Sequence, residues 1–165
     1  MEQKHTISIL VYDQPGVLTR VANLMGQRGF NIDSITVGQS EEKGISRMVI
    51  VTRGDEPTLE QMIKQFHKLI DVLKVTHLSS GSMVSRELVL VKVEANSATR
   101  AEINGIIEPF RATIVDVSPS SLVIQATGDS DKIDALIELL STYGIKELSR
   151  TGATAISRGA AAVKV

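Results

Sequence analysis

The 165-residue chain contains no cysteine and no tryptophan, and only 3% of its residues are aromatic. Without cysteine it cannot form a disulfide, use a thiolate nucleophile or bind zinc through sulfur. So few aromatic side chains argue against a protein that stacks bases or sugars on ring faces. The absence of cysteine is compatible with a cytoplasmic location, which we expect.

The chain also lacks an excess of charge and a long apolar run. Its formal net charge is −1, so no basic field attracts nucleic acid or anionic lipid. No apolar run approaches the roughly 18 residues of a membrane helix, and residues 1–5 lead directly into a strand-like segment instead of a signal-peptide core. We therefore expect no nucleic-acid partner and no membrane association.

Catalytic and metal-binding motifs are missing as well. The three histidines, His5, His67 and His77, are not spaced as in a metal motif such as H-E-x-x-H, and we expect them to be packed or solvated. The sequence contains no G-x-S-x-G, Walker A or G-x-G-x-x-G motif. We therefore expect no catalytic residue, no metal ligand and no cofactor in this chain.

What the sequence does contain is one pattern of elements repeated twice. In the first half, β-branched and apolar segments predict strands at 6–12, 30–39, 44–53 and 72–78. Helical spacing of apolar residues predicts a helix from Val17 to about Gly29, and a second helix after Asp55. In the second half, the same order predicts strands and helices at 87–94, 97–108, 111–117, 121–127, 129–142 and 145–150.

Each half therefore matches a split β-α-β unit, and the fold class is α+β with two ferredoxin-like βαββαβ domains in tandem. The small polar stretch Ser79-Ser80-Gly81-Ser82 suggests a flexible connection. We predict a first domain at 1–79, a linker at 80–84 and a second domain at 85–165, with a weakly ordered tail after Arg158.

Such a domain leaves one face of its sheet uncovered and, at about 75 residues, is marginally stable alone. Pairing with a second copy would cover apolar surface, so we predict at least a dimer. The alternative is that the two domains stack on each other within one chain.

The segment Asp13-Gln14-Pro15-Gly16 offers a candidate site between the first strand and the first helix. Free backbone N–H groups point out of a helix start, where the dipole favours negative charge. Gly16 lacks the Cβ that would block an α-carboxylate, and Asp13 could accept from an α-ammonium. Asn31, at the start of the second strand, can both donate and accept. These residue types suit an amino-acid zwitterion, although Asp-x-Pro-Gly is also an ordinary turn, which the spacing alone favours.

Residues 8–38, SILVYDQPGVLTRVANLMGQRGFNIDSITVG, resemble an ACT domain, the small amino-acid-sensing module. More narrowly, the run from Arg28 to Val37 is similar to the acetolactate synthase small-subunit family. Further matches extend the resemblance over nearly the whole chain: Ser46-Arg47-Met48, Arg86-Glu87-Leu88, Ile114-Val115-Asp116-Val117 and Ser157-Arg158-Gly159.

The resemblance implies a regulatory subunit that activates a separate catalytic large subunit and confers feedback inhibition by a branched-chain amino acid, valine first. That partner would hold thiamine diphosphate, Mg²⁺ and FAD. Two ACT domains would pair, with the effector at their interface, lined by Asp13, Gly16, Asn31, Ile32 and Gly38. Asp13 stands where the family usually has Asn, and this exchange adds a charge. Ile32 is equally compatible with a core position.

Two other functions remain open from the sequence. The chain could be a free-standing amino-acid-binding regulator of the ACT type. It could also be a small enzyme on a ferredoxin-like scaffold, because fold alone does not exclude catalysis. The second half lacks the Pro-Gly turn, and its bend at Glu94-Ala95-Asn96-Ser97-Ala98 suggests only helix capping.

Overall fold

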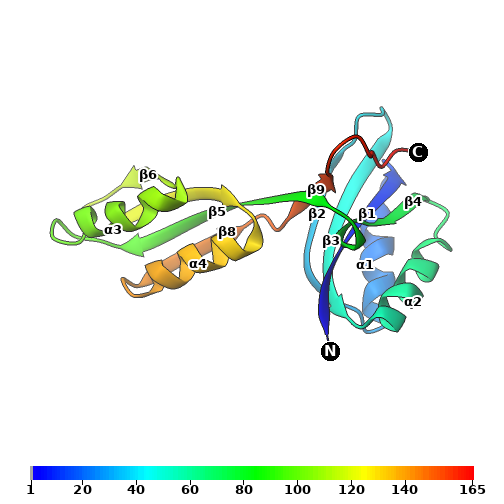
Figure 1. Ribbon diagram of the computed structural model, residues 1–165, viewed down its shortest axis with the longest axis horizontal. Coiled ribbons are helices and arrows are strands. Elements are labelled where there is room, and N and C mark those ends of the chain that lie inside the picture. Colours follow the sequence, from blue (N-terminus) through cyan, green and yellow to red (C-terminus); the bar gives the residue numbers. More distant parts are fainter. Residues whose placement is uncertain (1) are drawn as a thin grey trace. The chain divides into compact units, whose positions relative to one another are not determined.

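The computed structural model describes residues 2–165, which form two compact units. The first unit ends at Val84 and also includes Ala153–Val165, while the second comprises Ser85–Gly152. Each unit has an antiparallel sheet with two helices on one face (Figure 1). The fold predicted from the sequence is therefore confirmed in both halves.

The first unit follows the order β-α-β-β-α-β. Its elements are β1 (Gln3–Tyr12), α1 (Val17–Gln27), β2 (Asn31–Gln39), β3 (Ile45–Gly54), α2 (Glu56–Phe66) and β4 (Val72–His77). The strands lie in the order β2-β3-β1-β4, so β2 and β4 are the outer strands of this sheet. All three strand pairs are antiparallel.

The alternation of side chains along β1 builds the core of this unit. Ile7, Ile9 and Val11 point to the helices, where Met25 and Phe66 are among the buried residues that pack against them. α2 begins where its pattern predicts, because the Asp55 carboxylate accepts the Thr58 N–H at 2.9 Å. The apolar stripes of the two helices thus face one side of the sheet.

The second unit repeats the order with β5 (Met83–Glu94), α3 (Arg100–Ile107), β6 (Thr113–Val117), β7 (Ser121–Gly128), α4 (Ser130–Ser141) and β8 (Ile145–Arg150). Its sheet has the strand order β6-β7-β5-β8. Two short 3₁₀ helices, η1 (Leu78–Ser80) and η2 (Glu108–Phe110), complete the two units. α3 starts three residues later than predicted, because Asn96 to Thr99 form a capped turn before it.

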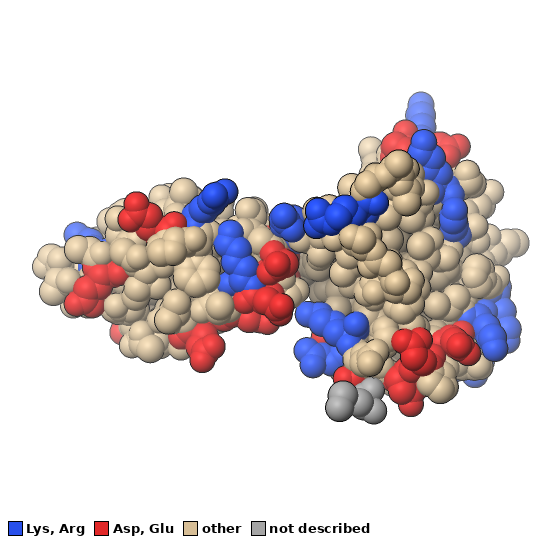
Figure 2. Space-filling view, viewed as in Figure 1, with Lys and Arg blue, Asp and Glu red and all other residues tan. Residues whose placement is uncertain are grey.

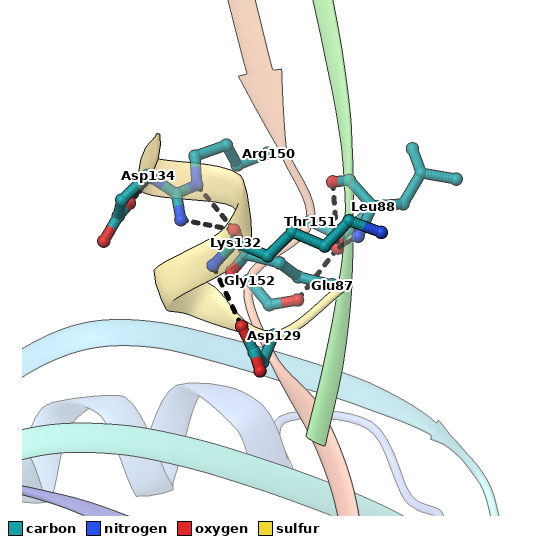
Figure 3. A network of polar contacts seen from close by, with 8 residues as sticks. All are labelled: Glu87, Leu88, Asp129, Lys132, Asp134, Arg150, Thr151 and Gly152. Carbon is teal, nitrogen blue, oxygen red and sulfur yellow. Dashed lines mark hydrogen bonds and ion pairs between the residues drawn. The ribbon is translucent and has the colours of Figure 1, made fainter. Parts of the chain in front are cut away.

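A polar network ties β5 and the end of β8 to α4 (Figure 3). Glu87, almost fully buried, accepts from Arg150 Nε at 2.7 Å, and Arg150 Nη1 also donates to Asp134 at 2.7 Å. Thr151 donates its backbone N–H to the Leu88 carbonyl at 3.0 Å. The network fixes the last residues of this unit against its central strand.

The predicted domain boundaries need correction at the linker and at the C-terminus. β5 already begins at Met83, so the expected flexible linker at 80–84 ends in a strand. We expected residues 85–165 to form the second domain, but Ala153–Val165 belong to the first unit. β9 (Thr154–Ser157) pairs with β5, and Arg158 donates its N–H to the Ser82 carbonyl at 3.0 Å.

The C-terminal segment, Ala153–Val165, covers part of the sheet face that the helices leave open. Ala155 is buried with Val49 and Leu78, and Met83 and Val163 pack around them. Arg47 Nη2 donates to the Val163 carbonyl at 2.9 Å. The expected weakly ordered tail is thus docked, because that face carries apolar side chains that would otherwise meet water.

Both units carry acidic and basic side chains on the face shown in Figure 2, in keeping with a net charge of −1. Within residues 2–165, no helix combines the length and the apolar character needed to cross a membrane.

Candidate functional site

The bend between β1 and α1 leaves the start of α1 without a side-chain cap. Gly16 is the N-cap residue, with φ of +84°, and no side chain of the described residues caps this end. By contrast, Asp55 and Asp129 cap α2 and α4. Val17 donates its N–H to the Gln14 carbonyl at 3.4 Å, whereas no side chain among residues 2–165 caps the Leu18 and Thr19 N–H groups that follow, and the helix dipole favours an anion there. A side chain at position 16 would be strained at this φ.

The bend is exposed but firmly held by its backbone. Tyr12 donates its N–H to the Asp71 carbonyl at 3.0 Å, and Asp13 donates to the Gly44 carbonyl at 2.8 Å. Residues 13–16 are all exposed. The predicted turn is therefore not sealed inside the fold, and it presents Asp13 and Gly16 on the surface.

Arg20 is a residue of this bend that the sequence reasoning did not place there. A Cβ built on Gly16 would lie 2.9 Å from Arg20 Nη1, so the guanidinium lies directly over the glycine. Arg20 Nε donates to Asp71 Oδ2 at 2.7 Å, and the Asp71 side chain is only 10% exposed. The signal available in the sequence was the i, i+4 spacing of Gly16 and Arg20, which puts both on one helix face.

The remaining predicted site residues lie on β2, at two different ends of the sheet. Asn31 pairs with Arg53 and Ile32 with Thr52, whereas Gly38 pairs with Arg47. Through β3, Gly38 is level with Leu10, near the end of β1 that leads to Gly16. Gly38 lies seven positions after Asn31 along β2, which corresponds to about 23 Å of strand.

A single chain therefore brings Asp13, Gly16 and Gly38 to one end of the sheet and Asn31 and Ile32 to the other. Asn31 and Gly38 are exposed. Ile32 is half-buried and packs against the core of the unit, so the core position that its sequence context allowed is confirmed. The five predicted residues therefore do not meet around one point within a single chain.

The corresponding bend of the second unit differs in chemistry. The Asn96 side-chain oxygen accepts the N–H groups of Ala98 and Thr99, at 2.9 and 3.0 Å. A cavity of about 310 Å³ lies beside it, with Glu94 and Tyr143 among its lining residues. Asn96 therefore caps the turn before α3, whereas Thr99, the N-cap residue of α3 itself, has no side-chain cap.

Two of the three histidines meet at the far end of β1. His5 Nδ1 lies 3.2 Å from His77 Nε2, and the Ser79 hydroxyl lies 3.0 Å from the same Nε2. Burial, and then the neighbouring His5, lower the pKa of His77 below its ordinary value. Residues 2–165 contain no group of three or more His, Cys, Asp or Glu side chains that could hold a metal ion.

Comparison with known families assigns each part of the chain. Residues 7–74 match the family described as the AHAS small subunit-like ACT domain. Residues 86–159 match the family described as the small subunit of acetolactate synthase. Together the two matches span the elements from β1 to β9.

Individual relatives agree over the full length. The probable acetolactate synthase small subunit of Methanothermobacter thermautotrophicus is 58% identical over 156 residues, covering 94% of this chain and 93% of that one. The acetolactate synthase small subunit of Bacillus subtilis is 54% identical over 157 residues, covering 94% and 91%.

The solved structure of the acetolactate synthase small subunit from Thermotoga maritima superimposes with a TM-score of 0.87 at 44% identity. It covers 96% of this chain and 99% of its own. With its two βαββαβ units and full-length likeness to these proteins, this chain belongs to the acetolactate synthase small-subunit family, and its first unit is an ACT domain.

Proposed function

We propose that this chain is a regulatory subunit that binds the catalytic large subunit of acetolactate synthase, raises its activity and makes it sensitive to a branched-chain amino acid. The catalytic partner would carry thiamine diphosphate, Mg²⁺ and FAD, and would join two pyruvates to 2-acetolactate. The observation that carries the proposal is the exposed, uncapped start of α1 at Gly16 in an ACT domain.

The chemistry of the bend suits the polar end of an amino acid. Open N–H groups at the start of α1 would receive the α-carboxylate, because the helix dipole favours negative charge there. The exposed carboxylate of Asp13 would accept from the α-ammonium. Ile32 would contact an aliphatic side chain such as that of valine, and Asn31 would add a donor and an acceptor.

A second copy would complete the site through the free edge of β2. β2 is an outer strand of its sheet, so its backbone can pair with another strand. Antiparallel pairing with β2 of a second copy reverses the strand direction. Asn31 and Ile32 of that copy would then lie at the end that carries Gly38, Asp13 and Gly16. We therefore propose a homodimer through the ACT domains, with the effector between the copies.

Feedback requires that the effector bind more tightly to one arrangement of the complex than to the other. Allosteric couplings are typically about 1–3 kcal/mol, or roughly 5- to 150-fold in affinity. A branched-chain amino acid that orders the dimer interface would have this effect on the catalytic partner.

Reconstitution tests the proposal. The purified chain alone should have no synthase activity, and titrating it into the large subunit should raise acetolactate production until saturation. Valine should then reverse the gain, with leucine and isoleucine compared in parallel. No response to mixing would contradict the subunit assignment, and binding of valine without any response would favour a free-standing regulator.

Calorimetric titration of the chain with each amino acid tests the effector site directly. Asp13→Asn should change the affinity for valine, because it removes a charge at the proposed ammonium contact. Glu60→Gln removes an equally exposed carboxylate on α2 and serves as the control. Equal effects of the two substitutions would contradict a role for Asp13.

A further inference from the structure

We propose that Arg20, held in place by the buried carboxylate of Asp71, supplies the guanidinium that receives the effector's carboxylate beside Gly16. This inference rests on the proposed function, because it assigns a further residue to the same site. The Arg20 side chain is partly exposed, and its hydrogen bond to Asp71 holds it in place.

The position of Arg20 follows from helix geometry. Its backbone N–H donates to the Gly16 carbonyl at 3.0 Å, one turn earlier in the chain. Side chains on a helix lean toward its N-terminus, so the Arg20 side chain lies back over the start of α1. Nη1 comes within 2.9 Å of the position that a Cβ on Gly16 would occupy. The glycine therefore makes room for the guanidinium as well as for a ligand.

Asp71 fixes the direction in which the guanidinium points. Its side chain, 10% exposed, accepts from Arg20 Nε at 2.7 Å, and its backbone carbonyl accepts the N–H of Tyr12. One residue thus anchors both the arginine and the strand that leads into the bend. Because the buried carboxylate of Asp71 bonds to Nε, the end of the guanidinium that carries Nη1 and Nη2 remains free to donate.

Those Nη groups are available where the ligand would arrive. The Arg20 side chain is 45% exposed, and the hydrogen bond to Asp71 uses only Nε. The planar fork of arginine matches a carboxylate with two parallel donors. Because Asp13 and Asp71 both place negative charge at this bend, a bound carboxylate needs a cation close by, and Arg20 provides it.

The test compares valine with valinamide, which keeps the ammonium and the side chain but has no carboxylate. Calorimetry on the full-length chain measures both affinities for the wild type and for Arg20→Met. The matched control is Arg28→Met, since Arg28 lies at the other end of α1 and also contacts α2, through Gln65 at 3.1 Å.

We expect Arg20→Met to weaken valine binding about tenfold to a hundredfold, the usual effect of losing a charge-assisted hydrogen bond, and to leave valinamide within about threefold. The preference for valine over valinamide should therefore collapse in this variant and persist in Arg28→Met. Asp71→Asn should reduce the preference in the same direction, because Arg20 loses its anchor.

An unchanged preference in a folded Arg20→Met chain would overturn the inference and leave Arg20 as a structural link between α1 and β4. If that variant fails to fold, Arg20→Lys is measured instead, because lysine keeps the charge but lacks the planar pair of donors. A reduced preference for valine over valinamide would then support the inference, and an unchanged preference would overturn it. Failure of the wild type to bind any of valine, leucine and isoleucine would instead contradict the proposed function.

Discussion

Truncation after Gly152 tests whether the C-terminal segment is part of the ACT domain. It removes β9 and the residues after it but keeps the contacts of Arg150 and Thr151 with β5. The second unit therefore retains its polar network and loses only the pairing of β9 with β5, so the loss should fall mainly on the first unit.

The expected loss follows from what the segment covers. Val49 is 1% exposed and Leu78 is 4% exposed, and both pack against Ala155. Full exposure of such aliphatic side chains costs about 1.5–3 kcal/mol each, and the sheet still shields one side of each. With the hydrogen bond from Arg47 to Val163, worth about 1 kcal/mol, the first unit should lose about 3–5 kcal/mol. That is much of the 5–15 kcal/mol typical of a domain.

Native-state hydrogen exchange measures this loss separately in each unit. Peptides from β1 and β3 should lose protection in the truncated chain, while peptides from β7 should keep theirs. Ala155→Asp should reproduce much of the effect, because it places a charge in the same small cluster, whereas Ala160→Asp, at an exposed position of the same segment, should not. Unchanged protection of β1 and β3 after truncation would refute the reasoning.

Three further outcomes follow from the described contacts. Gly16→Ala should destabilise the chain by about 1 kcal/mol in urea unfolding and weaken valine binding, since its Cβ meets a positive φ and the Arg20 guanidinium. Because the pKa of His77 is lowered in the fold, the unfolded chain takes up the proton first, so the free energy of unfolding should fall as pH drops below about 6.5. His77→Asn should flatten this pH dependence, whereas His67→Asn, at an exposed position, should not. Glu87→Gln should lower the free energy of unfolding of the second unit by about 1–3 kcal/mol, as measured by hydrogen exchange, because Arg150 loses a charged acceptor.

Local patterns in the sequence were sufficient to predict the elements. Helical spacing from Val17 and strand-like runs such as 6–12 placed both βαββαβ orders, because each element buries one face or one stripe against its own unit. The helix after Asp55 and the turn at Asn96 were predictable for the same reason, since a capping side chain contacts residues two or three positions away.

Contacts between distant segments were not predictable in this way. β9 has only four residues, and it packs near Val49, about a hundred positions earlier, so no periodicity marks it. The bond between Arg20 and Asp71 depends on how α1 and the start of β4 meet. The separation of Asn31 from Gly16 followed from the strand order rather than from either motif, because it is set by the register of β2 on β3.

The two bends that open the two units show why only one is a candidate for sensing. In the second unit, Asn96 gives its own oxygen to the backbone donors before α3, so a ligand there would compete with an intramolecular bond already made. In the first unit, Gly16 offers no side chain, and Arg20 adds a cation above the open donors of α1. A glycine at the N-cap, such as Gly16, costs only about a few tenths of a kcal/mol relative to a residue with a capping side chain. Under the proposed function, a bound carboxylate would accept from the uncapped donors of α1 and would therefore stabilise the bound domain relative to the free one.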